Sequence, residues 1–168
     1  ESQTEAGVPY ILYKDNINRK CNQSNIGIIK SSNLCAEITE VSNTSEYAVC
    51  NLGSIAVNKF VKLDKLKDIN FDPKYSEEKV LDNDAKLALQ GLLKSIYDFD
   101  GLKDISRVLT RNLNNIIDYN YYPVPETKRS NTRNRPIGLG IQGLGDIYYI
   151  LGVSYSSYIA KYIDALIM

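Results

Sequence analysis

The strongest constraint on the fold is a pair of long segments in which apolar residues recur at helical spacing. These are Ala85–Tyr97 and Gly101–Tyr119. Apolar residues three and four positions apart share one face of a helix, so each segment predicts an amphipathic helix packed against a core. Pro123 and Pro125 are expected to end the second helix, since proline cannot continue one. A third helix is expected at Tyr158–Met168.

The segments between these helices have other patterns. Tyr47–Cys50 predicts a short strand, which a turn joins to a helix at Ile55–Val61. Lys128–Arg135 is expected to be a basic, polar linker, and Gly138–Ile150 a glycine-punctuated entry to a further helix. Lys62–Asp84 is rich in Lys, Asp and Asn and contains a proline, so we interpret it as a solvated loop with little core of its own.

Charge and composition exclude several classes of protein. The 20 basic residues balance the 20 acidic ones, which leaves no electrostatic reason to expect binding to nucleic acid or to an anionic membrane. The absence of histidine excludes hydrolases that use a histidine base, and histidine zinc sites, within this chain. The first residues contain neither a basic leader nor an apolar signal core, and no initiator methionine. We therefore expect a piece of a longer protein that is neither secreted nor membrane-bound.

The chain has three cysteines, Cys21, Cys35 and Cys50. An odd and sparse count is not typical of a disulfide-stabilised secreted domain, so reduced thiols in the cytoplasm are expected. Three scattered cysteines also make a poor structural zinc site, and we expect no metal in this chain.

Residues around Cys35 alternate between polar and apolar. On extended backbone, Asn33, Cys35 and Glu37 would share one face, while Leu34 and Ala36 would point into a core. A nearby carboxylate disfavours a thiolate nucleophile, but it suits hydrogen-atom chemistry in which the carboxylate is a separate base. From spacing alone, a small buried cysteine between two solvated polar groups is the more common arrangement.

Several collinear motifs favour the chemical interpretation of Cys35 over that of a small buried cysteine. Together they resemble the large subunits of class I ribonucleotide reductases of the eukaryotic and viral type. The resemblance extends from Glu1 to about Tyr155, interrupted by Lys62–Gly101. The matching motifs are PYILYKD with NRK at residues 9–20, SNLCAEI at 32–38, AVCNLGS at 48–54, NYYPVPE at 120–126 and RPIGLGIQGL at 135–144.

The resemblance implies a role for each residue of the predicted site. Cys35 matches the cysteine that becomes a thiyl radical and takes the hydrogen atom from the ribose 3′ carbon. Glu37 matches the base for the 3′ hydroxyl, and Asn33 the residue that hydrogen-bonds that hydroxyl. Cys50 matches one member of the redox cysteine pair, whose other member is not in this chain. Cys21 matches no functional cysteine of the family.

The fold that the resemblance implies is part of a ten-stranded α/β barrel, with Cys35 on its central finger loop. Within it we expect three parts: an active-site finger-loop segment at residues 1–61, a polar insertion at 62–101, and a helical part of the barrel at 102–168. A piece excised from such a barrel would leave strand edges unpaired and helix faces exposed, so it is expected to be unstable without the remainder.

The implied function is the reduction of ribonucleoside diphosphates to deoxyribonucleotides for DNA synthesis. The family's partners would be a radical-generating small subunit that contains metal, a thioredoxin-type reductant and the rest of a homo-oligomeric large subunit. ATP and deoxynucleotide effectors would bind outside this segment, and no cofactor is expected within it. Because the partner of Cys50 and the radical-relay tyrosines are missing, this chain alone is expected to be inactive.

Two alternatives remain open. The first is a truncated, non-catalytic relative that acts as an interaction protein. The second is a nicotinamide site, because Gly138, Gly140 and Gly143 fit a dinucleotide-binding pattern with Asp164 downstream. That pattern requires a preceding strand and an acid at the end of a second strand, and we expect neither.

Overall fold

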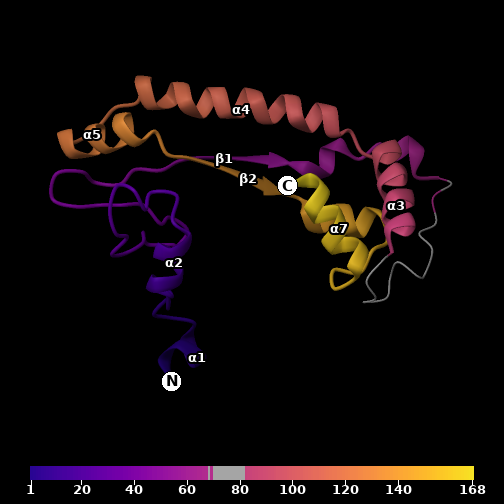
Figure 1. The fold of residues 1–168 in the computed structure, drawn as a ribbon, viewed down its shortest axis with the longest axis horizontal. Coiled ribbons are helices and arrows are strands. Elements are labelled where there is room, and N and C mark those ends of the chain that lie inside the picture. Colours follow the sequence, from indigo (N-terminus) through magenta and orange to yellow (C-terminus); the bar gives the residue numbers. More distant parts are fainter. Residues whose placement is uncertain (68, 70–81) are drawn as a thin grey trace. The chain divides into compact units, whose positions relative to one another are not determined.

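The computed structural model describes residues 1–67, 69 and 82–168, and combines helices with a pair of strands (Figure 1). None of the helices in this part of the chain has the length and apolar composition to cross a membrane. The elements in chain order are α1 (Ser2–Ala6), α2 (Lys14–Lys20), β1 (Asn51–Ala56), the 3₁₀ turns η1 (Val57–Phe60) and η2 (Leu63–Lys65), α3 (Asn83–Ile96), α4 (Phe99–Tyr119), α5 (Pro125–Asn134), β2 (Ile137–Gln142), α6 (Leu144–Ile150) and α7 (Tyr158–Ile167).

The chain divides into two compact units, while the three-part division expected from the sequence stays a prediction. The first unit consists of Glu1–Asn51 and Leu113–Gly138, and the second of Leu52–Asn112 and Leu139–Met168. Helix α4 therefore contributes to both units. Each unit is formed by segments that are distant in the sequence.

Strands β1 and β2 are hydrogen-bonded neighbours that run in the same direction (Figure 1). The strand predicted at Tyr47–Cys50 is wrong, since β1 begins at Asn51, where a turn was expected. The helix predicted at Ile55–Val61 is also wrong, because its first residues end β1 and the next four form the single turn η1. Pairing with β2, more than 80 residues further along the chain, extends this backbone, and local sequence does not reveal such a partner.

Helices α3, α4 and α7 confirm the three helices predicted from apolar periodicity. Asp82 caps α3 by accepting a hydrogen bond from the Ala85 amide at 2.7 Å. Buried Leu89, Leu93 and Ile96 are four and three residues apart on one face of α3. The segment expected to be a polar insertion thus supplies core residues at its C-terminal end, while residues 68 and 70–81 lie outside the described part.

The core of the second unit joins β1, η1, α3, α6 and α7. Tyr97 lies in this core, and its hydroxyl donates a hydrogen bond to the Val57 carbonyl at 2.9 Å. Burial raises the pKa of Tyr97 to about 12, and the charge of Asp98 contributes to this shift. The buried core residues are Ile55, Val57, Val61, Leu89, Leu93, Ile96, Tyr97, Leu102, Ile147, Tyr148, Ile159, Ala160 and Ile163.

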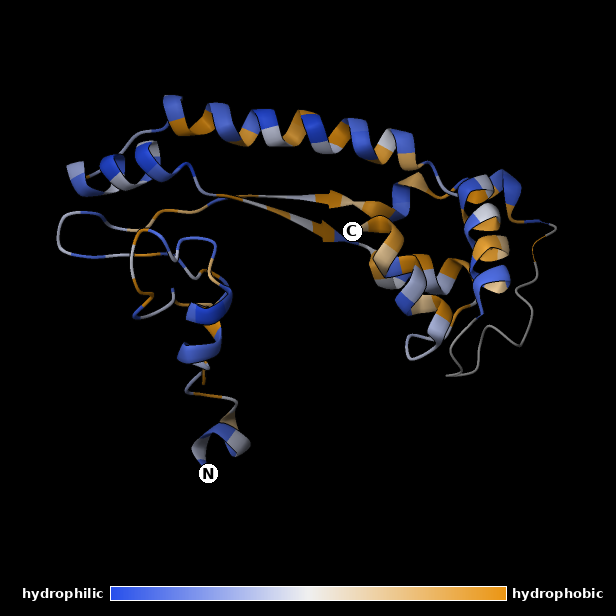
Figure 2. Cartoon of the chain, viewed as in Figure 1, coloured by the Kyte–Doolittle hydropathy of each residue, from blue (hydrophilic) through white to orange (hydrophobic). Residues whose placement is uncertain are grey.

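The first unit has a more polar interior. The linker expected at Lys128–Arg135 is wrong, because residues 125–134 form helix α5, with Pro125 in its first turn. This helix carries few hydrophobic residues (Figure 2), and its buried side chains are Ser130 and Asn131. Polar contacts therefore hold α5 in place.

Candidate active site

Residues Asn33 to Ala36 form a tight turn, which corrects the extended backbone expected here. The Ala36 amide donates to the Asn33 carbonyl at 3.1 Å, and Ala36 has a left-handed φ of 66°. Leu34 was expected to point into a core, but its side chain is 91% exposed. Cys35 is an exposed free thiol near the corner of the turn.

The side chain of Asn33 explains why the chain turns. Its Oδ1 accepts a hydrogen bond from the Ile38 amide at 3.0 Å and another from the Ser32 hydroxyl at 3.3 Å. The Ser32 hydroxyl is also 2.5 Å from the Ile38 carbonyl oxygen. Asparagine side chains that bond nearby backbone compete with strand ladders, so these contacts favour a closed loop over an extended segment.

The turn brings together Asn33 and Glu37, two of the predicted site residues. Asn33 Nδ2 donates to Glu37 Oε1 at 2.6 Å, and Cys35 lies between these residues in the sequence. The exposed Cys35 is thereby flanked in the sequence by an amide and a carboxylate that contact one another. A substrate hydroxyl near the thiol would find an acceptor in Glu37 and a donor in Asn33.

Cys50 lies immediately before β1 as a half-buried free thiol. Burial raises the pKa of this thiol, the charge of Glu40 raises it further, and Glu37 adds a smaller contribution. A hydrogen bond to the backbone acts in the opposite direction. Burial also raises the pKa of Glu40 itself, to about 7. Cys50 is therefore protonated over a wider pH range than an exposed cysteine, and Glu40 gains its charge near neutrality.

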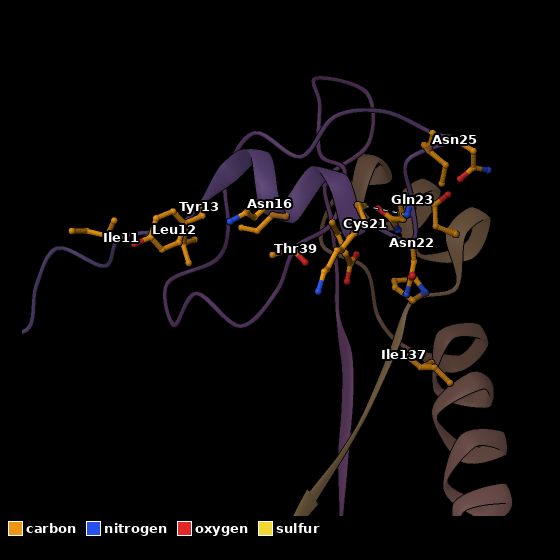
Figure 3. A pocket seen from close by; sticks show the side chains of 16 residues that line it. Ile11, Leu12, Tyr13, Asn16, Cys21, Asn22, Gln23, Asn25, Thr39 and Ile137 are labelled. Atoms are coloured by element: carbon orange, nitrogen blue, oxygen red, sulfur yellow. Dashed lines mark hydrogen bonds between the residues drawn. The ribbon is translucent and has the colours of Figure 1, made fainter. Parts of the chain in front are cut away.

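The first unit also contains an open cavity of about 890 Å³ beside α2 (Figure 3). Tyr13, Lys20, Cys21 and Glu40 are among the residues that line it. The Cys21 sulfur accepts a hydrogen bond from the Gln23 amide at 3.1 Å. Cys35 and the residues that flank it are not part of the described lining, so the cavity and the predicted site are separate features.

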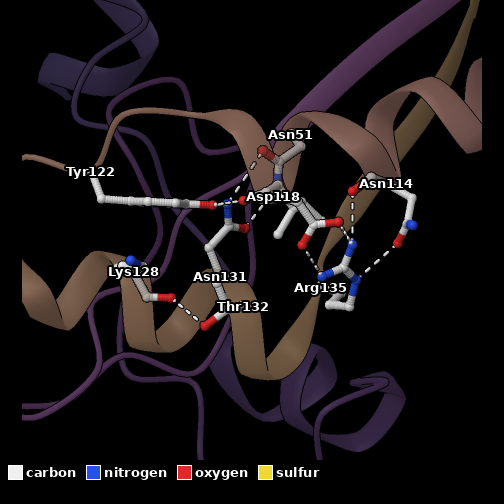
Figure 4. Close-up of polar contacts among 9 residues, drawn as sticks. Asn51, Asn114, Asp118, Tyr122, Lys128, Asn131, Thr132 and Arg135 are labelled. Atoms are coloured by element: carbon white, nitrogen blue, oxygen red, sulfur yellow. Dashed lines mark hydrogen bonds and ion pairs between the residues drawn. The ribbon is translucent and has the colours of Figure 1, made fainter.

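A buried polar network that the sequence reasoning missed lies directly after Cys50 (Figure 4). Asn51 Nδ2 donates to Asn131 Oδ1 at 2.7 Å and to the Pro136 carbonyl at 2.8 Å. Asn131 Nδ2 donates in turn to Tyr122 Oη at 2.6 Å. The Tyr122 hydroxyl also donates to the Ile117 carbonyl at 2.6 Å. The sequence signal that could have indicated this network is Asn51, a polar residue next to a predicted redox cysteine.

A second polar contact joins the end of α5 to α4 (Figure 4). The Arg135 guanidinium contacts both carboxylate oxygens of Asp118, at 2.8 and 2.9 Å, and also bonds Asn114. The hydrogen bonds from Arg135, followed by its positive charge, lower the pKa of Asp118. This pair is solvent-accessible and fixes the turn between α5 and β2.

The glycine-rich stretch departs from the dinucleotide pattern. Gly138 and Gly140 lie inside β2, and Gly143 precedes α6 with a left-handed φ of 82°. A strand does precede the helix here, contrary to expectation, but Asp164 lies within α7 as expected. The described residues therefore lack the acid at the end of a second strand that a dinucleotide site requires.

Parallel strands with connecting helices, together with a thiol-bearing turn flanked by an amide and a carboxylate, define a cysteine-containing α/β domain. Residues 1–168 match the family model described as the barrel domain of ribonucleotide reductase. The chain thus belongs to the ribonucleotide reductase barrel-domain family, and the predicted fold class, part of an α/β barrel, is confirmed.

Individual relatives agree with this assignment. The chain is 46% identical over 161 residues to the ribonucleoside-diphosphate reductase large chain of Schizosaccharomyces pombe, covering 96% of this chain and 16% of that protein. It is 46% identical over 159 residues to the large subunit from Arabidopsis thaliana, covering 93% and 18%. It is 44% identical over 162 residues to that of Acanthamoeba polyphaga mimivirus, covering 96% and 15%. The chain spans roughly a sixth of the length of the relatives that it matches.

Proposed function

We propose that this chain is the catalytic segment of a ribonucleoside-diphosphate reductase large subunit. The observation that carries the proposal is the turn in which Asn33 and Glu37 bond one another at 2.6 Å, with the exposed Cys35 between them in the sequence, in a chain of this family. The substrate would be a ribonucleoside diphosphate, and the product the corresponding deoxyribonucleotide for DNA synthesis.

Each residue of the turn has a defined part in the proposed reaction. Cys35, as a thiyl radical, takes the hydrogen atom from the ribose 3′ carbon and returns it at the end. Glu37 accepts the proton of the 3′ hydroxyl, while the Asn33 amide hydrogen-bonds the same oxygen. A thiol that carries a hydrogen atom needs no stabilised thiolate, which suits its position beside a carboxylate.

Cys50 supplies reducing equivalents together with a second cysteine elsewhere in the subunit. Over one turnover, the C2′–O bond breaks, the oxygen leaves as water, and a C2′–H bond forms. The two thiols become one disulfide, which provides the two electrons and two protons that this exchange requires. A thioredoxin-type reductant then restores both thiols. The raised pKa of Cys50 keeps it protonated, as a proton-donating thiol must be.

The proposal also assigns partners outside this chain. The radical originates in a small subunit that contains metal, since the reaction needs a one-electron oxidant to form the thiyl radical. ATP and deoxynucleotide effectors bind to other parts of a homo-oligomeric large subunit. We place the assembly in the cytoplasm, where a thioredoxin-type reductant keeps thiols reduced.

The test is a Cys35→Ser substitution in the full-length large subunit, assayed together with its small subunit. Ribonucleotide reduction should fall to background, because serine cannot form the hydrogen-abstracting thiyl radical, while substrate affinity should be unchanged. Cys21→Ser is the matched control and should retain activity. Full activity of the Cys35→Ser enzyme would contradict the proposal. An unsubstituted subunit that binds its partners without reducing nucleotides would instead support a non-catalytic interaction protein.

A further inference from the structure

Helix α5 contacts the chain immediately before Cys50. Arg133 Nη1 is 2.6 Å from Glu46 Oε1, and the Glu46 side chain is 6% exposed, so this carboxylate is nearly buried with the guanidinium as its partner. Arg129 donates to the Ser45 carbonyl at 2.9 Å. The Tyr47 amide donates to the Glu126 carbonyl at 3.3 Å. These three contacts restrain residues 45–47, three to five positions before the thiol.

The same helix also holds the residue immediately after Cys50. Asn131, which is fully buried, exchanges amide hydrogen bonds with Asn51 at 2.7 and 3.4 Å. The remaining Asn51 N–H bonds the Pro136 carbonyl, and the remaining Asn131 N–H bonds the Tyr122 hydroxyl. Every side-chain N–H of the amide pair therefore has an acceptor, which fixes one orientation for both side chains (Figure 4).

We propose that α5 is a positioning platform for the Cys50 thiol, with Asn131 and Arg133 as its positioning residues. The inference rests on the proposed redox role of Cys50. Disulfide formation needs the two Cβ atoms at about 3.5–4.5 Å and a narrow range of torsion angles, so small shifts of the backbone slow it. Contacts before and after Cys50 in the chain limit such shifts, whereas contacts on only one of these segments would leave the backbone at Cys50 able to move.

The charges of the platform are also compatible with this role. Arg133 on α5 forms an ion pair with Glu46 at 2.6 Å, so the contact between α5 and the segment before the thiol has no net charge. The contacts after the thiol are uncharged amides and a hydroxyl. Changes in α5 should therefore alter the position of Cys50 more than its electrostatic environment, which is set by burial and by Glu40 and Glu37.

The experiment uses the pre-reduced full-length subunit with its small subunit and measures the rate at which the Cys50 disulfide forms in a single turnover. Asn131→Ala and Arg133→Gln should each slow it about tenfold. Arg133→Lys should recover most of the rate, because it keeps the cation opposite Glu46. Thr132→Ala is the matched control and should be neutral, since among the described residues its exposed hydroxyl bonds only the Lys128 carbonyl within α5.

Two further measurements separate the possible failures. The pH dependence of Cys50 alkylation should be unchanged in Asn131→Ala, because this change removes an uncharged amide and the platform acts through position. Disulfide formation at the normal rate in both Asn131→Ala and Arg133→Gln would overturn the platform while leaving the proposed function intact. A Cys50→Ser subunit that completes single turnover with normal yield would instead overturn the redox role itself. If Asn131→Ala does not fold, the Arg133→Gln and Arg133→Lys pair decides the outcome.

Discussion

Two glutamates bear on the two cysteines that we propose react, each in a different way. Glu37 bonds Asn33 within the Cys35 turn, and Glu40 acts on Cys50 through its charge. These glutamates are three residues apart in the sequence. Glu40 was not singled out by sequence reasoning, because its effect depends on its half-buried position and not on any motif.

Substitution of Glu40 should change the reactivity of Cys50. Burial is the larger cause of the raised thiol pKa, and the negative charge of Glu40 adds to it. Because the pKa of Glu40 is about 7, this charge is present mainly above neutrality. Glu40→Gln should therefore lower the pKa of Cys50 and speed its alkylation above pH 7, with little change at pH 6. Mass spectrometry of alkylated peptides measures this.

Glu5, exposed on α1, provides a control, and Glu5→Gln should leave the alkylation of Cys50 unchanged. The rate should remain below that of an exposed cysteine in Glu40→Gln, because burial is unaffected. An identical pH profile in Glu40→Gln and the unsubstituted protein would show that Glu40 exerts no influence on the thiol.

Helices with an apolar stripe could be predicted from the sequence, whereas helices held by polar contacts could not. The pattern of α3 revealed Leu89 and Leu93, because burial of one face imposes helical spacing on apolar residues. In α5 the buried side chains are Ser130 and Asn131, which leave no hydrophobic pattern to read. The prediction of extended backbone around Cys35 was wrong for a related reason. The alternation of polar and apolar residues suggested a strand, but the Asn33 side chain accepts a hydrogen bond from the nearby Ile38 amide and so favours a turn.

Helix α3 offers a direct test of the core of the second unit. Leu89 is fully buried, whereas Leu87 on the same helix is 67% exposed. Leu89→Ala should lower the free energy of unfolding by about 2–5 kcal/mol, because it removes buried methyl groups and leaves a cavity. Leu87→Ala should change it by less than about 0.5 kcal/mol. Urea unfolding of the full-length polypeptide followed by fluorescence compares the two, and equal losses would contradict the assigned packing.

The turn between β2 and α6 tests the role of glycine in the stretch that resembles a dinucleotide motif. A Cβ on Gly143 would lie 2.8 Å from Asn58 Cγ, and its φ is 82°. Gly143→Ala should destabilise the protein by about 1–2 kcal/mol from backbone conformation, with a further cost from the contact. Gly145→Ala, inside α6 with open space around its Cβ position, should instead stabilise it by about 0.4–1 kcal/mol. Thermal unfolding distinguishes these opposite signs.

At the scale of the whole molecule, the proposed reactive cysteines and the main apolar core lie in different units. The first unit contains the Cys35 turn, Cys50 and the polar platform of α5, while the second provides an apolar core around Tyr97 and Ile163. The chain spans roughly a sixth of its relatives. Tyr13 and Leu34 are among the exposed large apolar residues.

The most direct test of the central claim follows the ribose 3′ hydrogen during reduction by the full-length enzyme. The substrate is a ribonucleoside diphosphate with a trace of tritium at the 3′ carbon. If Cys35 abstracts this hydrogen, unreacted substrate should become enriched in tritium as reduction proceeds, because the heavier bond breaks more slowly. The Cys35→Ser enzyme should show neither reduction nor enrichment. Reduction with no change in the tritium content of the remaining substrate, or reduction by the Cys35→Ser enzyme, would contradict the account.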